Sequence, residues 1–167
     1  TPTHVSAGNV AFGKSITAVN GHASHPASNL NDGNMDTYVR AQYGSTNDAK
    51  FTIDLGSEQP ISLAHLYSRD LSAKKIQHFT LDYTTSASGD DDWHVLVDVN
   101  VDTTATSSLD NVVWNFDRVT ARRVRINIDK CDTVYSGTFY LEELEFYNAA
   151  NGTPTLTLNG DSRMSIE

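Results

Sequence analysis

Apolar residues recur at every second position in one short segment after another, and this period constrains the fold more than any other feature. It is clear at Phe51, Ile53 and Leu55, which alternate with polar residues. Comparable segments are 61–67, 79–83, 95–99, 112–116 and 124–128. Such alternation is typical of a strand with one buried face, and no long segment has the 3.6-residue period of a helix. The sequence therefore predicts an all-β fold, either a sandwich or a barrel of short antiparallel strands.

Oxygen donors crowd into residues 29–37, which read Asn-Leu-Asn-Asp-Gly-Asn-Met-Asp-Thr and are called the cation loop below. Closely spaced carboxylate, amide and backbone oxygens around a glycine are how a loop binds a hard cation such as Ca²⁺. Asp32, Asn34 and Asp36 match the first three ligand positions of an EF-hand, but the turn glycine and final glutamate of that motif are missing. A site completed by distant residues fits better. The alternative is a turn without metal, because Asn, Asp and Gly dominate turns for backbone reasons.

The last predicted strand changes phase. Phe139 and Leu141 alternate, and the pattern slips before it resumes at Leu144 and Phe146. A slip of this kind is typical of a β-bulge, which redirects one side chain. Glu143 is therefore expected to point inward, toward the cation loop, where a buried carboxylate needs a partner and a cation would supply one.

Composition excludes some classes of partner. The 167 residues suffice for one domain with a real core, since 38% of them are hydrophobic. The net charge of −9 argues against duplex DNA or an anionic membrane as the main partner. Cys131 is the only cysteine, so an intrachain disulfide is impossible. No apolar run reaches the length of a membrane span and no signal peptide opens the chain, so we expect a piece excised from a longer protein.

The two ends of the sequence suggest domain boundaries. Residues 9–19 predict a first, irregular strand, and residues 27–31 suit one helical turn. We expect residues 1–148 to form the main domain and residues 149–154 to form a linker. Residues 155–167 open a new alternating pattern that resembles the first strand of the immunoglobulin-like repeats of bacterial secreted proteins. The parent protein is therefore expected to have several domains.

Four stretches carry a resemblance to a known family: residues 9–14, 27–38, 51–56 and 141–147. Together they resemble coagulation-factor type C (F5/8 type C), or discoidin, domains, and within that superfamily the family 32 carbohydrate-binding modules of secreted bacterial enzymes. The resemblance implies a jelly-roll β-sandwich of about eight antiparallel strands with a structural calcium ion. Carried over by motif, the implied ligands are the carbonyls of Asn29, Asn34 and Glu142, the carboxylates of Asp32 and Glu143, and the carbonyl and hydroxyl of Thr37.

The resemblance also implies sugar binding in loops at one end of the sandwich. The matching positions are Arg40, Tyr43 and Arg69, with His25 and Lys74 as further candidates. Galactose-binding relatives commonly have histidine at the first of these positions, so Arg40 is a departure. An aromatic face stacks on a pyranose, and guanidinium groups bind hydroxyls or, bidentately, carboxylate and sulfate.

Basic residues are concentrated in the same loops. Arg40, Arg69, Lys74 and Lys75 are four of only 12 in an acidic chain. This favours an anionic glycan, such as a uronic-acid or sulfated polysaccharide, over a galactose-type sugar. The alternative is that Arg69 pairs with Asp70 and that the lysines are ordinary solvated surface.

These observations favour a noncatalytic, monomeric carbohydrate-binding module of a secreted bacterial polysaccharide-degrading enzyme, with its catalytic domain in the same parent chain. The partner would be a polysaccharide or oligosaccharide outside the cell. A discoidin-type adhesion module that binds protein or lipid is the alternative, because fold does not fix function. A hydrolase or lyase fragment would need an acid/base pair, and the sequence offers none outside Glu142, Glu143 and Glu145.

Overall fold

The computed structural model describes residues 7–40, 49–71, 75–101, 111–131, 139–149, 156–158 and 164–166. The strands are β1 (Ser15–Val19), β2 (Val39–Arg40), β3 (Ala49–Tyr67), β4 (Ile76–Thr84), β5 (His94–Asn100), β6 (Asn111–Cys131), β7 (Tyr140–Leu141), β8 (Glu143–Tyr147), β9 (Leu156–Leu158) and β10 (Met164–Ile166). A 3-10 turn, η1 (Ala27–Leu30), lies where one helical turn was expected. Every strand pairing is antiparallel, which confirms the predicted all-β class.

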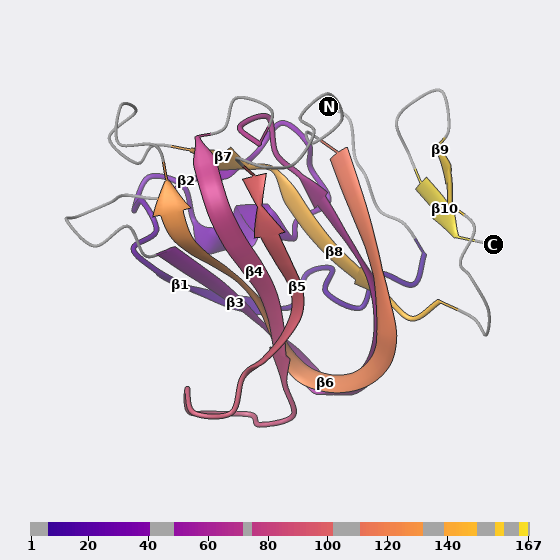
Figure 1. Ribbon diagram of the computed structural model, residues 1–167. Helices are drawn as coiled ribbons and strands as arrows, with labels where there is room; N and C mark the ends of the chain where they lie inside the picture. The colour runs from indigo at the N-terminus through magenta and orange to yellow at the C-terminus, as the bar shows by residue number, and fades with distance from the viewer. Residues whose placement is uncertain are drawn as a thin grey trace.

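Two long strands, β3 and β6, bend and pair with each other on both sides of the bend (Figure 1). Residues 49–54 of β3 belong to a layer ordered β1-β3-β6-β4-β5. Beyond the bend, β3 pairs with both β6 and β8. The sequence predicted separate strands on the two sides of Gly56, but the strand runs on, with register shifts between Asp54 and Gln59 and between Ile61 and Leu63. Gly56 has φ 83°, a left-handed conformation that suits glycine and permits the bend.

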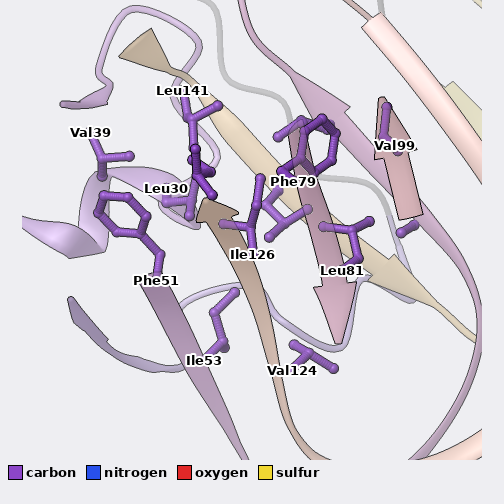
Figure 2. Packing of buried hydrophobic residues seen from close by; sticks show 14 of the residues in the cluster. Leu30, Val39, Phe51, Ile53, Phe79, Leu81, Val99, Val124, Ile126 and Leu141 are labelled. Carbon is purple, nitrogen blue, oxygen red and sulfur yellow. The ribbon is translucent and has the colours of Figure 1, made fainter. Parts of the chain in front are cut away.

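The core lies between the two layers and is closed at one end by the segment before the cation loop. Phe51 and Ile126 project into it from β3 and β6, and Phe79 from β4 (Figure 2). Leu30 of η1 and Leu141 of β7 belong to the same cluster and are fully buried. Burial of one leucine stabilises the fold by about 1.5 to 3 kcal/mol. The start of the cation loop is therefore anchored in the core.

The predicted phase slip near the last strand is present. The strand is interrupted at Glu142, where β7 pairs with β2 and β8 pairs with β3. All five residues of β8 are buried, so its outward-facing positions are covered as well as its core-facing ones. Glu143, the first residue of β8, is directly opposite Tyr67 on β3.

The first predicted strand is shorter than expected. Only Ser15–Val19 forms a ladder, while Asn9 makes an isolated bridge to Tyr147. The side-chain amide of Asn31 donates to the carbonyls of Ala11 and Lys14, both at 2.8 Å. These carbonyls are thus satisfied by a side chain, and the intervening residues form turns instead of a strand.

At the C-terminus, β9 and β10 pair as a two-stranded sheet. Most of the predicted linker, 149–154, lies outside the described residues, and the start of a following domain at residues 155–167 stays a prediction. In the described part of the chain, no helix has the length and apolar character needed to span a membrane.

Candidate functional site

The cation loop folds back on itself with its oxygens turned inward. The hydroxyl of Thr37 donates to Asp32 Oδ2 at 2.6 Å and lies 2.9 Å from the carbonyl of Asn34. The backbone N–H of Asn34 donates to Asp32 Oδ1 at 2.9 Å. Gly33 has φ 74°, a left-handed conformation that glycine adopts readily. Carboxylate, carbonyl and hydroxyl oxygens are thereby gathered within one turn.

Glu143 enters this loop from β8, as the phase slip predicted. Its Oε1 accepts the backbone N–H of Gly33 at 3.0 Å, and its side chain is fully buried. Its Oε2 is also buried and has no hydrogen-bond partner among the described residues. Burial, together with the nearby carboxylates of Glu145 and Asp32, raises the pKa of Glu143 to about 10. Two neighbouring carboxylates offer each other no hydrogen-bond donor unless one of them is protonated.

This donor set fits a hard cation. A buried, unpartnered carboxylate oxygen beside a second carboxylate is costly, and a divalent cation would offset both charges. No group of three or more His, Cys, Asp or Glu side chains suited to a metal occurs in the described ranges, so a cation here would need carbonyl and hydroxyl oxygens as further ligands. Asn29 donates its side-chain amide to the Tyr38 carbonyl at 3.1 Å, and the Glu142 carboxylate turns to Arg69. The Glu142 carboxylate is therefore engaged elsewhere, and the backbone carbonyls of Asn29 and Glu142 are the ligands that the family resemblance implies.

Beside the cation loop, a guanidinium lies over two tyrosine rings. The Cζ of Arg69 is 5.4 Å from the ring centroid of Tyr38 and 5.5 Å from that of Tyr140. The two rings meet edge to face, with centroids 4.5 Å apart. The His25 ring lies 4.6 Å from Tyr38, and the His22 ring lies 5.7 Å from His25. These five residues are called the aromatic platform below.

Arg69 is fixed on one side and open on the other. Its Nε donates to Glu142 Oε1, and its backbone N–H donates to Glu142 Oε2 at 3.2 Å. The Glu142 side chain is 7% exposed, whereas that of Arg69 is 55% exposed. The hydrogen bond to Glu142 raises the pKa of Arg69, while burial raises that of Glu142. The terminal amino groups of Arg69 make no hydrogen bond to any described residue, and the side chain is more than half exposed.

Tyr140 is held by the neighbouring loop. Its backbone N–H donates to Asp70, and its carbonyl accepts from the Ser68 hydroxyl at 2.7 Å. Lys75 Nζ lies 3.1 Å from Asp70 Oδ1 and 5.7 Å from the Tyr140 ring centroid. Arg69 thus pairs with Glu142 and not with Asp70, whose cationic partner is Lys75. Arg69 and Lys75 are thus each matched by a carboxylate.

Of the predicted sugar-binding residues, Arg69 and His25 belong to the platform. Arg40 is half-buried on β2, in register with Tyr140, and its carbonyl accepts the His22 N–H at 2.8 Å. Tyr43 and Lys74 lie outside the described residues.

The two tyrosines of the platform were not among the residues predicted to bind sugar. Tyr38 directly follows the cation loop, so the sequence already showed an aromatic residue next to the predicted metal site. Tyr140 is out of phase with the core-facing Leu141, which indicates a side chain that points away from the core.

The chain was also compared with known proteins. A family model described as F5/8 type C domain matches residues 15–142. No curated protein sequence matches the chain significantly. Solved structures with the same fold include chitosan-binding module 1 from the chitosanase/glucanase of Paenibacillus sp. IK-5, with 23% identity, a TM-score of 0.69 and coverage of 83% of this chain and 98% of that one.

Two further structures carry bound sugars. The family 32 carbohydrate-binding module of C. perfringens NanJ, in complex with galactose, has 17% identity and a TM-score of 0.62, with 80% of this chain and 92% of that one covered. The lectin domain of lectinolysin, complexed with Lewis B antigen, has 19% identity and a TM-score of 0.65, with 87% and 100% covered. Because identities this low establish the fold alone, these matches confirm the predicted discoidin-like β-sandwich.

Proposed function

Because the chain belongs to the F5/8 type C domain family, we propose that it is a noncatalytic carbohydrate-binding module whose sugar site is the aromatic platform. The observation that carries this proposal is the open edge of Arg69, exposed above Tyr38 and Tyr140. Aromatic rings offer a pyranose its stacking surface, and a fixed guanidinium offers directed hydrogen bonds. The fold neighbours named above as chitosan-binding, galactose-bound or Lewis-B-bound support a sugar as the ligand class.

Within that class we propose an anionic glycan, such as a uronic-acid or sulfated polysaccharide. The two terminal amino groups of Arg69 form a planar fork that matches a carboxylate or sulfate bidentately. Glu142 and Asp70 already offset the charges of Arg69 and Lys75, so recognition depends on this geometry more than on a strong positive field. A galactose-type sugar is the alternative, in which the same fork binds a pair of hydroxyls.

A Ca²⁺ ion in the cation loop is part of the proposal. Asp32, Asn34, Thr37 and Glu143 would hold it, together with the carbonyls of Asn29 and Glu142. The ion would supply positive charge to the buried carboxylate of Glu143 and the half-buried carboxylate of Asp32, and would thereby stabilise the folded loop. Its support is the buried, unpartnered Oε2 of Glu143.

The proposed setting is a secreted bacterial enzyme that degrades polysaccharide, in which this module binds the glycan and a catalytic domain of the same chain acts on it. The source of the Paenibacillus module, a chitosanase/glucanase, supports such a setting. A shallow platform implies weak binding at each site, with affinity gained through tethering or repeated sites. We propose that the module acts as a monomer.

The test is a glycan array with Ca²⁺ present that includes uronic-acid, sulfated, galactose and chitosan glycans, followed by calorimetry on the strongest glycan. Arg69→Ala and Tyr38→Ala should each lower affinity at least about tenfold, the cost of losing one charged or stacking contact. Arg122→Ala is the matched control, because Arg122 pairs with Asp54 at the bend of β3 and β6 and should leave affinity unchanged.

Three results would contradict this proposal. Full binding by Arg69→Ala would refute the site. Binding to neutral glycans without dependence on salt would refute the anionic class, since exposed charge pairs are screened by salt. Binding to lipid vesicles or to protein, with no glycan bound, would favour the adhesion module instead.

A further inference from the structure

The aromatic platform and the cation loop are joined by two segments of chain that are distant in sequence. Tyr38 directly follows Thr37, the last residue of the loop. Glu142 directly precedes Glu143, whose carboxylate accepts the N–H of Gly33. Both sides of the contact between Arg69 and Tyr38 are therefore connected to the same loop.

The first connection fixes Tyr38. The side-chain amide of Asn29, at the start of the loop, donates to the Tyr38 carbonyl at 3.1 Å. At the end of the loop, the Thr37 hydroxyl bonds to Asp32 and Asn34. The main chain of Tyr38 is thus positioned by both ends of the loop.

The second connection fixes Arg69. The Glu142 carboxylate accepts both the backbone N–H and the Nε–H of Arg69, and it is almost completely buried. The backbone N–H of Glu142 donates to the Tyr67 carbonyl at 3.0 Å, at the end of β3. A shift of the segment 142–143 would therefore carry the guanidinium of Arg69 with it.

We propose that Glu142 is a positioning residue that couples a cation in the loop to the placement of Arg69 over Tyr38. Without a cation, the buried Oε2 of Glu143 has no hydrogen-bond partner among the described residues, and separation of the loop from β8 exposes this oxygen to water. That separation moves Glu142 and releases Arg69. With the cation bound, the loop and β8 are held together and Arg69 stays over the tyrosines.

This inference rests on the proposed function, which it deepens by making glycan binding depend on calcium. Coupling between two ligands is reciprocal, so calcium should raise glycan affinity and the glycan should raise calcium affinity by the same factor. The structural link can be tested with Ca²⁺ alone, without any sugar.

The experiment follows the arginine Nε–Hε signals of the ¹⁵N-labelled protein by NMR, with Ca²⁺ and after addition of EGTA. The signal of Arg69 is assigned by its loss in Arg69→Lys. Its exchange with water should be slow with Ca²⁺ and roughly tenfold faster after chelation, as expected when a charge-assisted hydrogen bond opens. The internal control is Arg122, whose Nε donates to Asp54 Oδ1 at 2.8 Å, at the bend of the long strands.

Three variants separate the link from other effects. Asp32→Asn should give fast exchange at Arg69 even with Ca²⁺ present. Asp54→Asn makes the same chemical change at the bend of β3 and β6, and the exchange of the Arg69 Nε–Hε proton should stay slow in this variant. Glu142→Gln should give fast exchange with and without Ca²⁺, because the acceptor that connects Arg69 to the loop is weakened.

The proposal is overturned if chelation changes the stability of the fold without changing the exchange rate of the Arg69 Nε–Hε proton. It is equally overturned if the exchange rate of Arg122 rises together with that of Arg69, because the whole fold would then have loosened. It is also overturned if Glu142→Gln retains slow, calcium-dependent exchange. A calcium-dependent Arg69 signal in a protein that binds no glycan would support the link and refute the proposed function. Glycan binding that is equally strong with Ca²⁺ and with EGTA would support the proposed function and refute the link.

Discussion

The N–H of Gly33 donates to the carboxylate of Glu143 at 3.0 Å and so joins the cation loop to β8, although the two residues are far apart in sequence. The second oxygen of that carboxylate is buried without a hydrogen-bond partner among the described residues. This contact connects the fold, the proposed calcium ion and the sugar site, and it leads to the first prediction.

Glu143→Gln should remove the gain in stability that Ca²⁺ gives. At 100 times its dissociation constant, Ca²⁺ should stabilise the unsubstituted protein by about 2.7 kcal/mol. Without Ca²⁺, the substitution should be neutral or stabilising, because it removes a buried carboxylate whose charged form is disfavoured. Calorimetric unfolding with Ca²⁺ and with EGTA would measure both effects. Equal gains from Ca²⁺ in the two proteins would place the ion elsewhere.

The unfolding free energy should decrease as pH rises through the range where His78 loses its proton. Its Nδ1 lies 2.5 Å from Asp129 Oδ1 and its Nε2 lies 2.6 Å from Asp98 Oδ1, so His78 joins β4, β5 and β6. The hydrogen bond to Asp129, then that to Asp98, raises the pKa of His78 in the folded state. The stabilisation is therefore complete below the unfolded pKa of about 6.5 and is lost as pH rises through the higher folded value.

Urea unfolding between pH 5.5 and 8.5 would test this. His78→Gln should flatten the decrease, whereas His94→Gln, on the neighbouring edge strand β5, should leave it in place. A decrease that persists in His78→Gln would assign it to another group.

Trp93→Phe should be nearly neutral, whereas Trp93→Ala should destabilise the fold by roughly 1 to 3 kcal/mol. The Trp93 ring centroid lies 4.1 Å from Cζ of Arg125 and 5.0 Å from Cζ of Arg123. Arg125 in turn pairs with the buried Asp82 at 2.8 Å, so the ring shields an ion pair from water. The indole N–H has no hydrogen-bond partner among the residues described, so replacement by phenylalanine removes no hydrogen bond to them and keeps an aromatic ring over the arginines. Equal losses for both variants, measured by urea unfolding, would contradict the shielding role.

Leu30→Ala should destabilise the fold by about 2 to 5 kcal/mol, the usual cost of a cavity at a fully buried leucine. Val95→Ala is the matched control, because Val95 on β5 is 60% exposed and should cost less than about 0.5 kcal/mol. Denaturant midpoints of the two variants give the comparison. Similar losses would mean that η1 is not packed in the core.

Several features could be predicted from the sequence because they depend on local pattern. The alternation at residues 51–55 and 124–128 predicted strands and which of their faces is buried. The phase slip near Glu142 predicted that Glu143 points inward, since a bulge redirects one side chain. The turn chemistry of residues 29–37 likewise predicted a loop rich in oxygen donors.

Other features could not be read in this way. The sequence divided β3 at Gly56 and Pro60, yet β3 is one strand that pairs with β6 on both sides of the bend. Tyr43, the aromatic residue expected to contact sugar, lies outside the described residues and stays a prediction, and the contact between Tyr38 and Tyr140 was not expected from the sequence. The hydrophobic period and the turn residues describe only a few neighbouring positions, so they do not indicate which loops that are distant in sequence will lie side by side.

The all-β class, most of the strands with their buried faces, and the inward turn of Glu143 follow from local sequence pattern. That Tyr38 meets Tyr140 and that Glu142 pairs with Arg69 depends on how the chain packs. The physical reason is that alternation specifies which side of a strand is buried, while its partners depend on how two bent layers pack around a shared core.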